Sequence, residues 1–357
     1  MADDFRYHID HHVGLVPPAD LLQARADHDR GALDDAGLRA AEDSAIRDAL
    51  RLQRRLGLIA MGDGQYRRRS PLSVFYDHVD GFAAALEGGP IAELLGERLT
   101  PVRRALGGSP VPRERLAQRE AEFLVAHCKQ RNRVVALPSP GYVAALCATG
   151  DEGSGQELAA IVRDEVAALA AQGIEYVQLH NPVIAFLLTV AGRERARGLG
   201  IDPDATLDLI LSTDGAVLSD LDAPADFRVA LDITTCGELD TGQGYDTRTL
   251  AGFLDRQPFE RLCVEYLAAD AGRFPIEELR PDCVVALGIV DVGTPEMESA
   301  DELVDLVDKA ATVMDIDSIA LSTNGPFHAG TRFNADRQRD KLQIVETVAR
   351  YYWGNEL

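Results

Sequence analysis

Short apolar runs alternate with longer stretches of helical spacing along almost the whole chain, and this alternation constrains the fold more than any other feature. Seven runs are clear and the first is weaker: 7–14, 58–64, 133–140, 174–182, 228–236, 261–267, 283–291 and 318–324. The helical stretches cover 33–56, 155–172, 184–198, 205–222, 246–255, 299–315 and 335–352. Strands that are apolar on both faces, each followed by a helix, predict a (β/α)8 TIM-type barrel. A doubly wound open α/β sheet is the alternative.

The connection after the second run is too long for a simple loop and helix. Residues 65–132 are therefore predicted to form a helical insertion over the barrel mouth, with helices near 78–87, 90–98 and 113–130. No linker or low-complexity tract divides the chain, so one barrel domain is expected over residues 1–357.

The net charge of the chain limits the kinds of binding partner that can be expected. With 58 Asp and Glu against 36 Lys and Arg, the net charge is −22, which argues against binding to nucleic acid or to an anionic membrane surface. A small-molecule substrate is expected, and a homo-oligomer is left open. No apolar leader or membrane-length apolar run is present, which predicts a cytoplasmic protein. Dinucleotide, P-loop, HExxH and GxSxG motifs are also absent from the sequence.

Barrel enzymes place their chemistry where strands end and the following loops begin. This rule turns the strand positions into candidate site residues. The polar or thiol side chains at these ends include His11, His12, Asp63, Gln65, Ser139, His180, Asn181, Asp232, Thr234, Cys236, Glu265, Asp291, Ser322 and Asn324. Each of them, taken singly, is also an ordinary capping residue, so the collection carries more weight than its members.

Eight motifs follow one another along the chain: HHVG at 11–14, PPADLL at 17–22, AEDSAIRDALRLQRRLGLIAMGDGQYRRR at 41–69, LPSP at 137–140, IEYVQLHNP at 174–182, RVALDI at 228–233, CVEY at 263–266 and ALGIVDVGTPEMES at 286–299. From about residue 8 to residue 353, their order resembles the catalytic C-terminal domain of cobalamin-independent methionine synthase and its stand-alone relatives. The resemblance implies a barrel whose mouth binds zinc, which activates a thiol substrate for methyl transfer.

The ligands that the resemblance implies are only partly present. The family uses His-x-Cys after strand five, Glu at strand six and Cys at strand eight. Here Asp232 and Thr234 stand at the first two positions, Glu265 keeps the third, and the fourth falls on or near Gly325, with His328 as the nearest metal-capable side chain. The thiolate-rich zinc site of the family is therefore not expected.

The family's acidic contacts to the ammonium group of homocysteine are also missing. Gln65, His180 and Asn181 stand where the family has carboxylates. Each lost charge-assisted contact is worth about 1.5–3 kcal/mol, so homocysteine is expected to bind poorly.

A different metal site can be drawn from the same strand ends. His180, Asp232 and Glu265, joined by His328, would suit one divalent ion such as zinc or iron. The alternative is that Asp232 and Glu265 are hydrogen-bonded remnants that accept from Thr235 or from loop amides. Cys236 could supply a thiolate or be a partly buried free cysteine.

The remaining candidates are assigned to substrate. His12 is interpreted as a substrate-contacting or hydrogen-bonding residue rather than a metal ligand. The run Arg67–Arg69 could clamp a carboxylate or phosphate, or could pair with nearby acids. The substrate-binding set predicted from the sequence is Gln65, Arg67, Ser139, Asn181 and Asn324.

These residues lead to three hypotheses. The first is a methionine-synthase-like transferase of methyl or small alkyl groups acting on a thiol-like substrate other than homocysteine, with His180, Asp232, Glu265 and His12 as catalytic residues and with folate as an unproven donor. The second is a metal-dependent lyase or oxygenase that uses His180, Asp232 and Glu265 as a facial triad. The third is a non-catalytic barrel that binds a small molecule.

Overall fold

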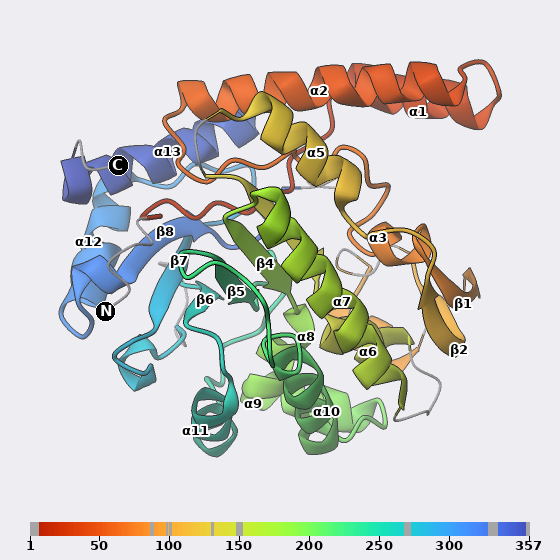
Figure 1. Cartoon of the computed structure of the whole chain (residues 1–357). Helices are drawn as coiled ribbons and strands as arrows, with labels where there is room; N and C mark the ends of the chain where they lie inside the picture. The colour runs from red at the N-terminus through yellow and green to blue at the C-terminus, as the bar shows by residue number, and fades with distance from the viewer. Residues whose placement is uncertain are drawn as a thin grey trace.

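The computed structural model describes residues 7–85, 89–97, 99, 102–129, 132–147, 153–267, 273–327 and 335–354 (Figure 1). Its α-helices are α1 Ala19–Asp29, α2 Asp35–Arg55, α3 Ser73–Tyr76, α4 Pro90–Leu95, α5 Gln118–His127, α6 Pro140–Cys147, α7 Gly153–Gln172, α8 Pro182–Leu188, α9 Val190–Gly198, α10 Pro203–Gly215, α11 Thr247–Arg256, α12 Ala300–Ala311 and α13 Ala335–Trp353. Its strands are β1 Val79–Ala85, β2 Arg104–Pro112, β3 Val134–Pro138, β4 Tyr176–His180, β5 Arg228–Asp232, β6 Arg261–Glu265, β7 Val284–Val290 and β8 Ile319–Thr323.

Six strands form one parallel sheet in the order β3-β4-β5-β6-β7-β8, which confirms an α/β fold with a parallel sheet. All six coincide with apolar runs picked out in the sequence. In this register His180 lies opposite Asp232, so the carboxyl ends of neighbouring strands bring predicted site residues side by side.

The first two predicted strands are not regular strands. Single parallel bridges join them to their neighbours instead: Ile9 to Leu321 of β8, Gly14 to Gly64, and Met61 to Arg133 beside β3. The two segments thus lie between the outer strands of the six-stranded sheet. The predicted barrel is confirmed in part: the strand order is as expected, but the parallel sheet has six strands rather than eight among the described residues.

Inside the curve of the sheet, small side chains leave room for a buried charge. The inward-facing cluster includes Ala136, Ala230, Ala286 and Ala320, whereas the residues between them pack outward on the helices. Buried Asp10 accepts hydrogen bonds from Tyr176 (2.8 Å), Gln178 (2.7 Å) and Arg261 (2.7 Å). The interior of the sheet therefore holds an ion pair between Asp10 and Arg261, and Asp10 has a structural role there.

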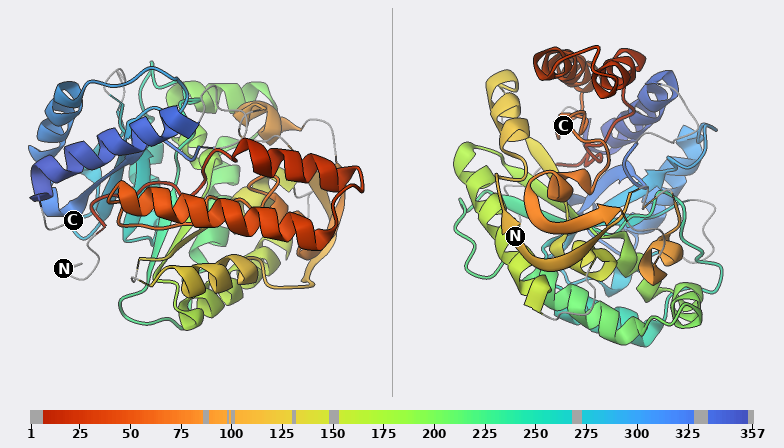
Figure 2. Two further views of the ribbon diagram at one scale, coloured as in Figure 1. Left: turned by 90° about the horizontal axis from the view of Figure 1, so that it is seen from above. Right: turned by 90° about the vertical axis from the view of Figure 1, so that its right-hand side faces the viewer.

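Residues 65–132 contain both helices and strands. β1 and β2 form an antiparallel hairpin, so the helix expected near 78–87 is wrong: this segment is a strand. Leu99, from the same stretch, accepts a hydrogen bond from the hydroxyl of Tyr142 at 3.1 Å. Figure 2 shows the hairpin in front of the sheet, with the long α1–α2 pair at one side.

One of the predicted helices is divided in the structure. The predicted helix 184–198 is two helices, because Thr189 has an extended backbone and its side chain caps α9 by accepting a hydrogen bond from the Gly192 amide.

None of the described helices has the length and apolar character that crossing a membrane requires.

Candidate functional site

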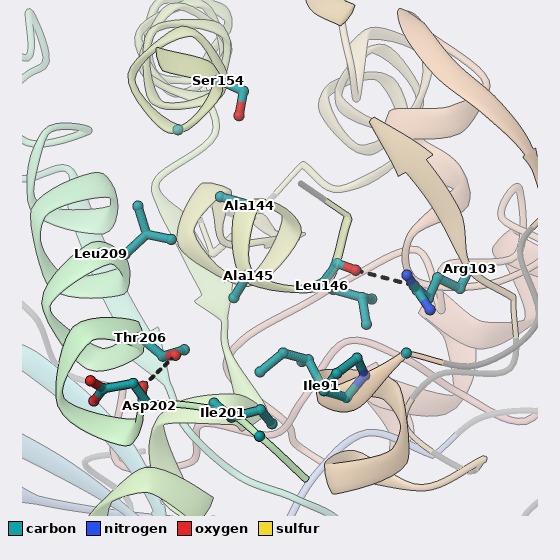
Figure 3. Close-up of a pocket in the computed structure, with 14 residues that line it drawn as sticks. Ile91, Arg103, Ala144, Ala145, Leu146, Ser154, Ile201, Asp202, Thr206 and Leu209 are labelled. Carbon is teal, nitrogen blue, oxygen red and sulfur yellow. Dashed lines mark hydrogen bonds between the residues drawn. The ribbon is translucent and has the colours of Figure 1, made fainter. Parts of the chain in front are cut away.

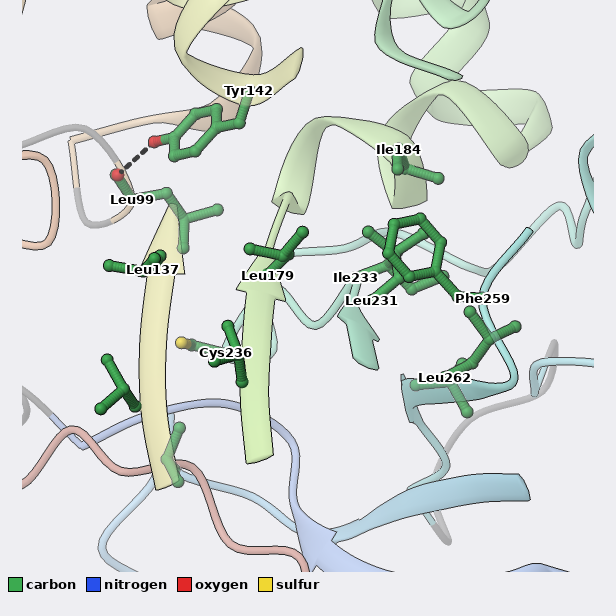
Figure 4. Close-up of a cluster of buried hydrophobic side chains, with 14 of the residues drawn as sticks. Leu99, Leu137, Tyr142, Leu179, Ile184, Leu231, Ile233, Cys236, Phe259 and Leu262 are labelled. Atoms are coloured by element: carbon green, nitrogen blue, oxygen red, sulfur yellow. Dashed lines mark hydrogen bonds between the residues drawn. The ribbon is translucent and has the colours of Figure 1, made fainter. Parts of the chain in front are cut away.

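A cavity of about 170 Å³ opens at the carboxyl ends of the strands. Its polar and thiol lining includes Gln65, His180 and Cys236, and its apolar walls include Leu99, Tyr142 and Phe327. Figure 4 shows Tyr142 and Leu99 above the ends of β3 and β4. A volume near 150 Å³ holds a molecule of about the size of benzene, so the enclosed part of this site suits a small substrate. We call it the mouth cavity.

Two residues of the mouth cavity have a backbone conformation that side chains disfavour. Gln65 has φ of 57° and Cys236 has φ of 58°. Only four described non-glycine residues have positive φ, and two of them line this cavity. Such conformations cost free energy and concentrate at functional sites, which favours this cavity as the site.

His180, at the end of β4, has one ring nitrogen that could accept a proton from a ligand. Its Nε2 lies 3.0 Å from the carbonyl oxygen of Thr234, and a carbonyl can only accept, so Nε2 carries a hydrogen. In the neutral ring Nδ1 is then an acceptor, and no described residue donates a hydrogen bond to it. His180 is the predicted catalytic residue that the structure brings to the cavity with proton-accepting capacity.

Cys236 reaches the mouth cavity because the chain turns sharply after β5. The Cys236 amide donates to the carbonyl of Asn324 at 3.1 Å, which draws the loop across towards β8. A Cβ atom added at Gly325 would lie 2.5 Å from Sγ of Cys236. The thiol thus fills the space in front of position 325.

His12 and Asp232 form a buried ion pair beneath this cavity. Nδ1 of His12 lies 2.9 Å from Oδ2 of Asp232, and Nε2 lies 3.0 Å from the carbonyl oxygen of Thr323. Burial by itself would lower the pKa of His12, but the charge and hydrogen bond of Asp232 outweigh it and raise the pKa. Burial also opposes ionisation of Asp232, yet the charge of His12 lowers its pKa to about 2. Both ring nitrogens have acceptors, so His12 is a positively charged imidazolium.

The other oxygen of Asp232 is also committed. Oδ1 accepts from the amide of Thr234 at 3.0 Å and from its hydroxyl at 2.7 Å. Glu265 behaves in the same way: its Oε1 accepts from the amide (2.7 Å) and hydroxyl (2.8 Å) of Thr235 and from the amide of Gly237 (3.1 Å). The hydrogen-bonded alternative raised for both carboxylates agrees with these contacts.

Ser139 and Asn181 belong to a buried network behind the strand ends. The Ser139 hydroxyl donates to Oδ2 of Asp214 at 2.9 Å, and Nδ2 of Asn181 lies 3.0 Å from the same oxygen. Oδ1 of Asp214 accepts from the amide of Gly141 at 2.7 Å, and burial raises the pKa of this carboxyl to about 6. Asp214 was not predicted, since it lies inside helix α10 with no motif to mark it.

Two other predicted substrate residues lie in structural contacts. Arg67 is paired with Glu42 (3.3 Å) and Asp43 (2.6 Å), the alternative in which the arginines pair with acids. Asn324 donates to Asp291 at 3.0 Å and accepts from the amide of Val292 at 2.8 Å. His328 lies outside the described residues.

The N-terminal histidines are separated rather than clustered. Nε2 of His11 donates a hydrogen bond to Oε1 of Gln53 at 3.1 Å, and burial lowers the pKa of His11 to about 4. His8 stacks on Trp353 with ring centroids 4.3 Å apart. His8, His11 and His12, which follow one another closely in the sequence, therefore have different partners and do not form a cluster.

A larger cavity of about 420 Å³ lies among α4, α6, α7 and α10 (Figure 3). Its walls include Ala144, Leu146, Ile201 and Leu209, and Arg103 donates to the carbonyl of Leu146 at 3.2 Å. This cavity lacks histidine and cysteine among its described lining residues. The smaller mouth cavity is therefore the better candidate for chemistry.

Comparison with known proteins tests the resemblance. No family model matches the chain. Over nearly its full length it superimposes on a putative vitamin-B12-independent methionine synthase of Listeria monocytogenes, with a TM-score of 0.74, 19% identity and 98% of each chain covered. A B12-independent methionine synthase of Shewanella sp. W3-18-1, solved with selenomethionine, gives a TM-score of 0.71 at 19% identity and 91% coverage of each chain.

The chain has the fold of the cobalamin-independent methionine synthases. Sequence matches agree with this: YxjH, an uncharacterized Bacillus subtilis protein, is 23% identical over 97% of this chain and 95% of its own length. A 5-methyltetrahydropteroyltriglutamate–homocysteine methyltransferase of Cronobacter sakazakii is 28% identical over 48% of this chain, but the match spans only 23% of that enzyme. The resemblance predicted from the motifs is thus confirmed as a likeness of fold, at low sequence identity.

Zinc, the ion that this methionine synthase fold implies, does not fit the residues described here. Both oxygens of Asp232 already accept hydrogen bonds, from His12 and Thr234, and the described oxygen contacts of Glu265 serve the loop after β5. Where the methionine synthases are expected to have a second cysteine, Gly325 leaves no room for one beside Cys236. No group of three His, Cys, Asp or Glu residues within the described ranges is arranged to hold a metal.

Proposed function

We propose that the protein is a methyltransferase-type enzyme that moves a methyl or other small alkyl group to or from a small thiol-like substrate in the mouth cavity. The observation that carries this proposal is a methionine-synthase fold with an open imidazole nitrogen, on His180, at the expected end of the barrel. The relatives' printed names point to methyltetrahydropteroyl compounds as the first donors to test.

The residues of the mouth cavity suggest how the methyl group could be transferred, with His180 as the proton acceptor and donor. Nδ1 of His180 takes the proton of the substrate thiol, and the resulting thiolate forms a bond to the methyl carbon. The bond between that carbon and the donor nitrogen breaks, and its electron pair stays on the nitrogen. A proton from the His180 imidazolium then restores the donor's N–H group. Cys236 supplies a polarizable wall in the same cavity.

Homocysteine is an unsuitable acceptor in this proposal. Gln65 and His180 line the cavity where the family is expected to have carboxylates, and none of the described lining residues is Asp or Glu. A substrate ammonium group would thus meet no compensating charge. The metal-dependent lyase or oxygenase gains no support, because Asp232 and Glu265 already accept hydrogen bonds from His12, Thr234 and Thr235.

A transfer assay tests the proposal. The wild-type protein is incubated with 5-methyltetrahydrofolate labelled in the methyl group and, separately, with 2-mercaptoethanol or homocysteine, and S-methylated product is measured by mass spectrometry. We expect methylated 2-mercaptoethanol in excess over methionine, since that thiol lacks an ammonium group. No labelled product with either thiol, under conditions where a relative turns over homocysteine, would overturn the proposal.

A further inference from the structure

The mouth cavity carries positive charge in a protein whose net charge is −22. Arg25, Arg68 and Arg69 line it together with His180, and no carboxylate does among the lining residues that the structure describes. An acidic chain that gathers guanidinium groups around an acid-free cavity has the electrostatics of an anion site.

Two of these arginines are already neutralised. Arg68 is buried and binds both oxygens of Glu120 at 2.7 and 2.6 Å, and it also donates to the carbonyl of Ala136. Arg69 binds both oxygens of Asp29 at 2.9 and 2.5 Å. Neither needs a further anion.

Arg25 differs from both. Its Nη2 donates to the carbonyl oxygens of Tyr66 (2.8 Å) and Arg68 (2.9 Å), which are neutral acceptors. Among the described residues it forms no ion pair, and its Nε and Nη1 make no described hydrogen bond. The two carbonyl contacts fix the guanidinium plane at the cavity wall, which preorganises the remaining N–H groups for a bidentate partner.

We infer that Arg25 is the binding site for a substrate carboxylate, so that the mouth cavity takes a small carboxylic acid bearing a thiol and no ammonium group. The thiol part rests on the proposed function, whereas the carboxylate part rests on the cavity alone. A carboxylate fits better than a phosphate, because only one cavity-lining arginine lacks a described carboxylate partner. Burial lowers the pKa of Arg25, and the charges of Glu42 and Asp29 offset this effect only in part.

Three probes of similar size separate the contributions. 3-Mercaptopropionate has the thiol and the carboxylate, 3-mercaptopropan-1-ol has only the thiol, and propionate has only the carboxylate. Dissociation constants are measured by ligand-observed NMR titration on the full-length wild-type protein and on Arg25→Gln, Arg25→Lys and Arg69→Gln. Arg69 is the matched control, because it lines the same cavity but is paired with Asp29.

We expect Arg25→Gln to weaken both acids about 10- to 100-fold, the range for a lost charge-assisted hydrogen bond. Binding of 3-mercaptopropan-1-ol stays within about twofold, which separates a charge effect from a general loss of cavity shape. Arg25→Lys recovers part of the affinity, and Arg69→Gln changes it by less than about threefold. Wild-type protein that does not bind the acids, or acids that bind Arg25→Gln as tightly as wild type, would overturn the inference.

The two proposals can fail separately. If propionate binds in an Arg25-dependent way and no thiol is ever methylated, the carboxylate site stands and the transferase proposal falls. If 3-mercaptopropan-1-ol is methylated as fast as 3-mercaptopropionate, and equally in Arg25→Gln, the transferase stands and the carboxylate site falls.

Discussion

The floor and the wall of the mouth differ in how their polar groups are used. On the floor, His12, Asp232 and Glu265 hold one another and the loops in a buried set of hydrogen bonds. On the wall, His180 and Arg25 keep nitrogen atoms that no described residue engages. Charged and titratable residues around one cavity therefore divide into those that hold the protein together and those whose atoms are available to a ligand.

Replacing His180 is the sharpest test of the wall. We expect His180→Ala to lower the methyl-transfer rate by roughly 100- to 10,000-fold, the usual contribution of a positioned base. The melting temperature should change little, because the side chain makes one hydrogen bond and is partly exposed. His28→Ala, a half-buried histidine on α1 that does not line the mouth cavity, is the control. Retention of full activity would place the catalytic base elsewhere.

Replacing Asp232 tests the floor. Asp232→Asn leaves the buried His12 cation without its counter-charge, and breaking a buried pair costs about 3–5 kcal/mol. The free energy of unfolding, from urea titration at pH 6, should fall by that amount. Asp246→Asn, at the half-buried N-cap of α11, should change it by less than about 0.5 kcal/mol, since Asn is an equally good cap. A loss below 1 kcal/mol for Asp232→Asn would show that the pair does not support the fold.

The same pair sets a pH dependence. The pKa of Asp232 is about 2 when folded against 3.8 when unfolded, so its contribution is present above pH 3.8 and is lost as the pH falls through 2. The pKa of His12 is raised when folded, so its contribution is complete below 6.5 and is lost as the pH rises through the folded value. The stability gap between wild type and Asp232→Asn should thus be widest between these limits. It should shrink by about 2–3 kcal/mol on the acid side, as measured by urea titration from pH 2 to pH 9.

A substitution at Gly325 tests how tightly Cys236 is packed at the edge of the mouth cavity. Gly325→Ala places a methyl group against the Cys236 thiol and should cost roughly 1–3 kcal/mol of stability. Part of that loss should be recovered in Cys236→Gly/Gly325→Ala, which a double-mutant cycle on unfolding free energies measures. Strict additivity of the two changes would mean that the side chains do not compete for space.

Chelation should have the smallest effect. Because Asp232 and Glu265 already have hydrogen-bond donors, treatment with EDTA should leave the melting temperature and the transfer rate unchanged. Elemental analysis of protein purified without chelator should find zinc and iron well below one atom per chain. Stoichiometric metal that EDTA removes with loss of activity would contradict this expectation.

The fold was accessible from the sequence wherever alternation was strong. The ends of β3 to β8 follow from apolar runs closed by turn residues, and so does the adjacency of His180 and Asp232. The hairpin was missed because VDGFAAA lacks polar alternation, and its alanines favour a helix on propensity alone. Helix α1 was missed because only Leu21 among its residues is buried, which leaves no apolar stripe.

The sequence was enough to predict where the site lies, but not what each of its residues contacts. His12 and Asp232 are 220 positions apart, and nothing local in either segment shows that they pair. Cys236 lies two positions too far along for the family pattern, and the left-handed turn that brings it to the mouth comes from its contact with Asn324. Arg25 lies in a helix with no motif, so its carbonyl contacts and missing counter-ion appear only in three dimensions.

The competition between Cys236 and position 325 also restricts the order in which such a barrel can change. With the thiol of Cys236 in place, a cysteine cannot be gained at 325 by one tolerated substitution, and the reverse change meets the same obstacle. A lineage moving between the two arrangements must pass through an ancestor with sulfur at neither position. For a time, that intermediate would have to be maintained by selection for something other than its thiol.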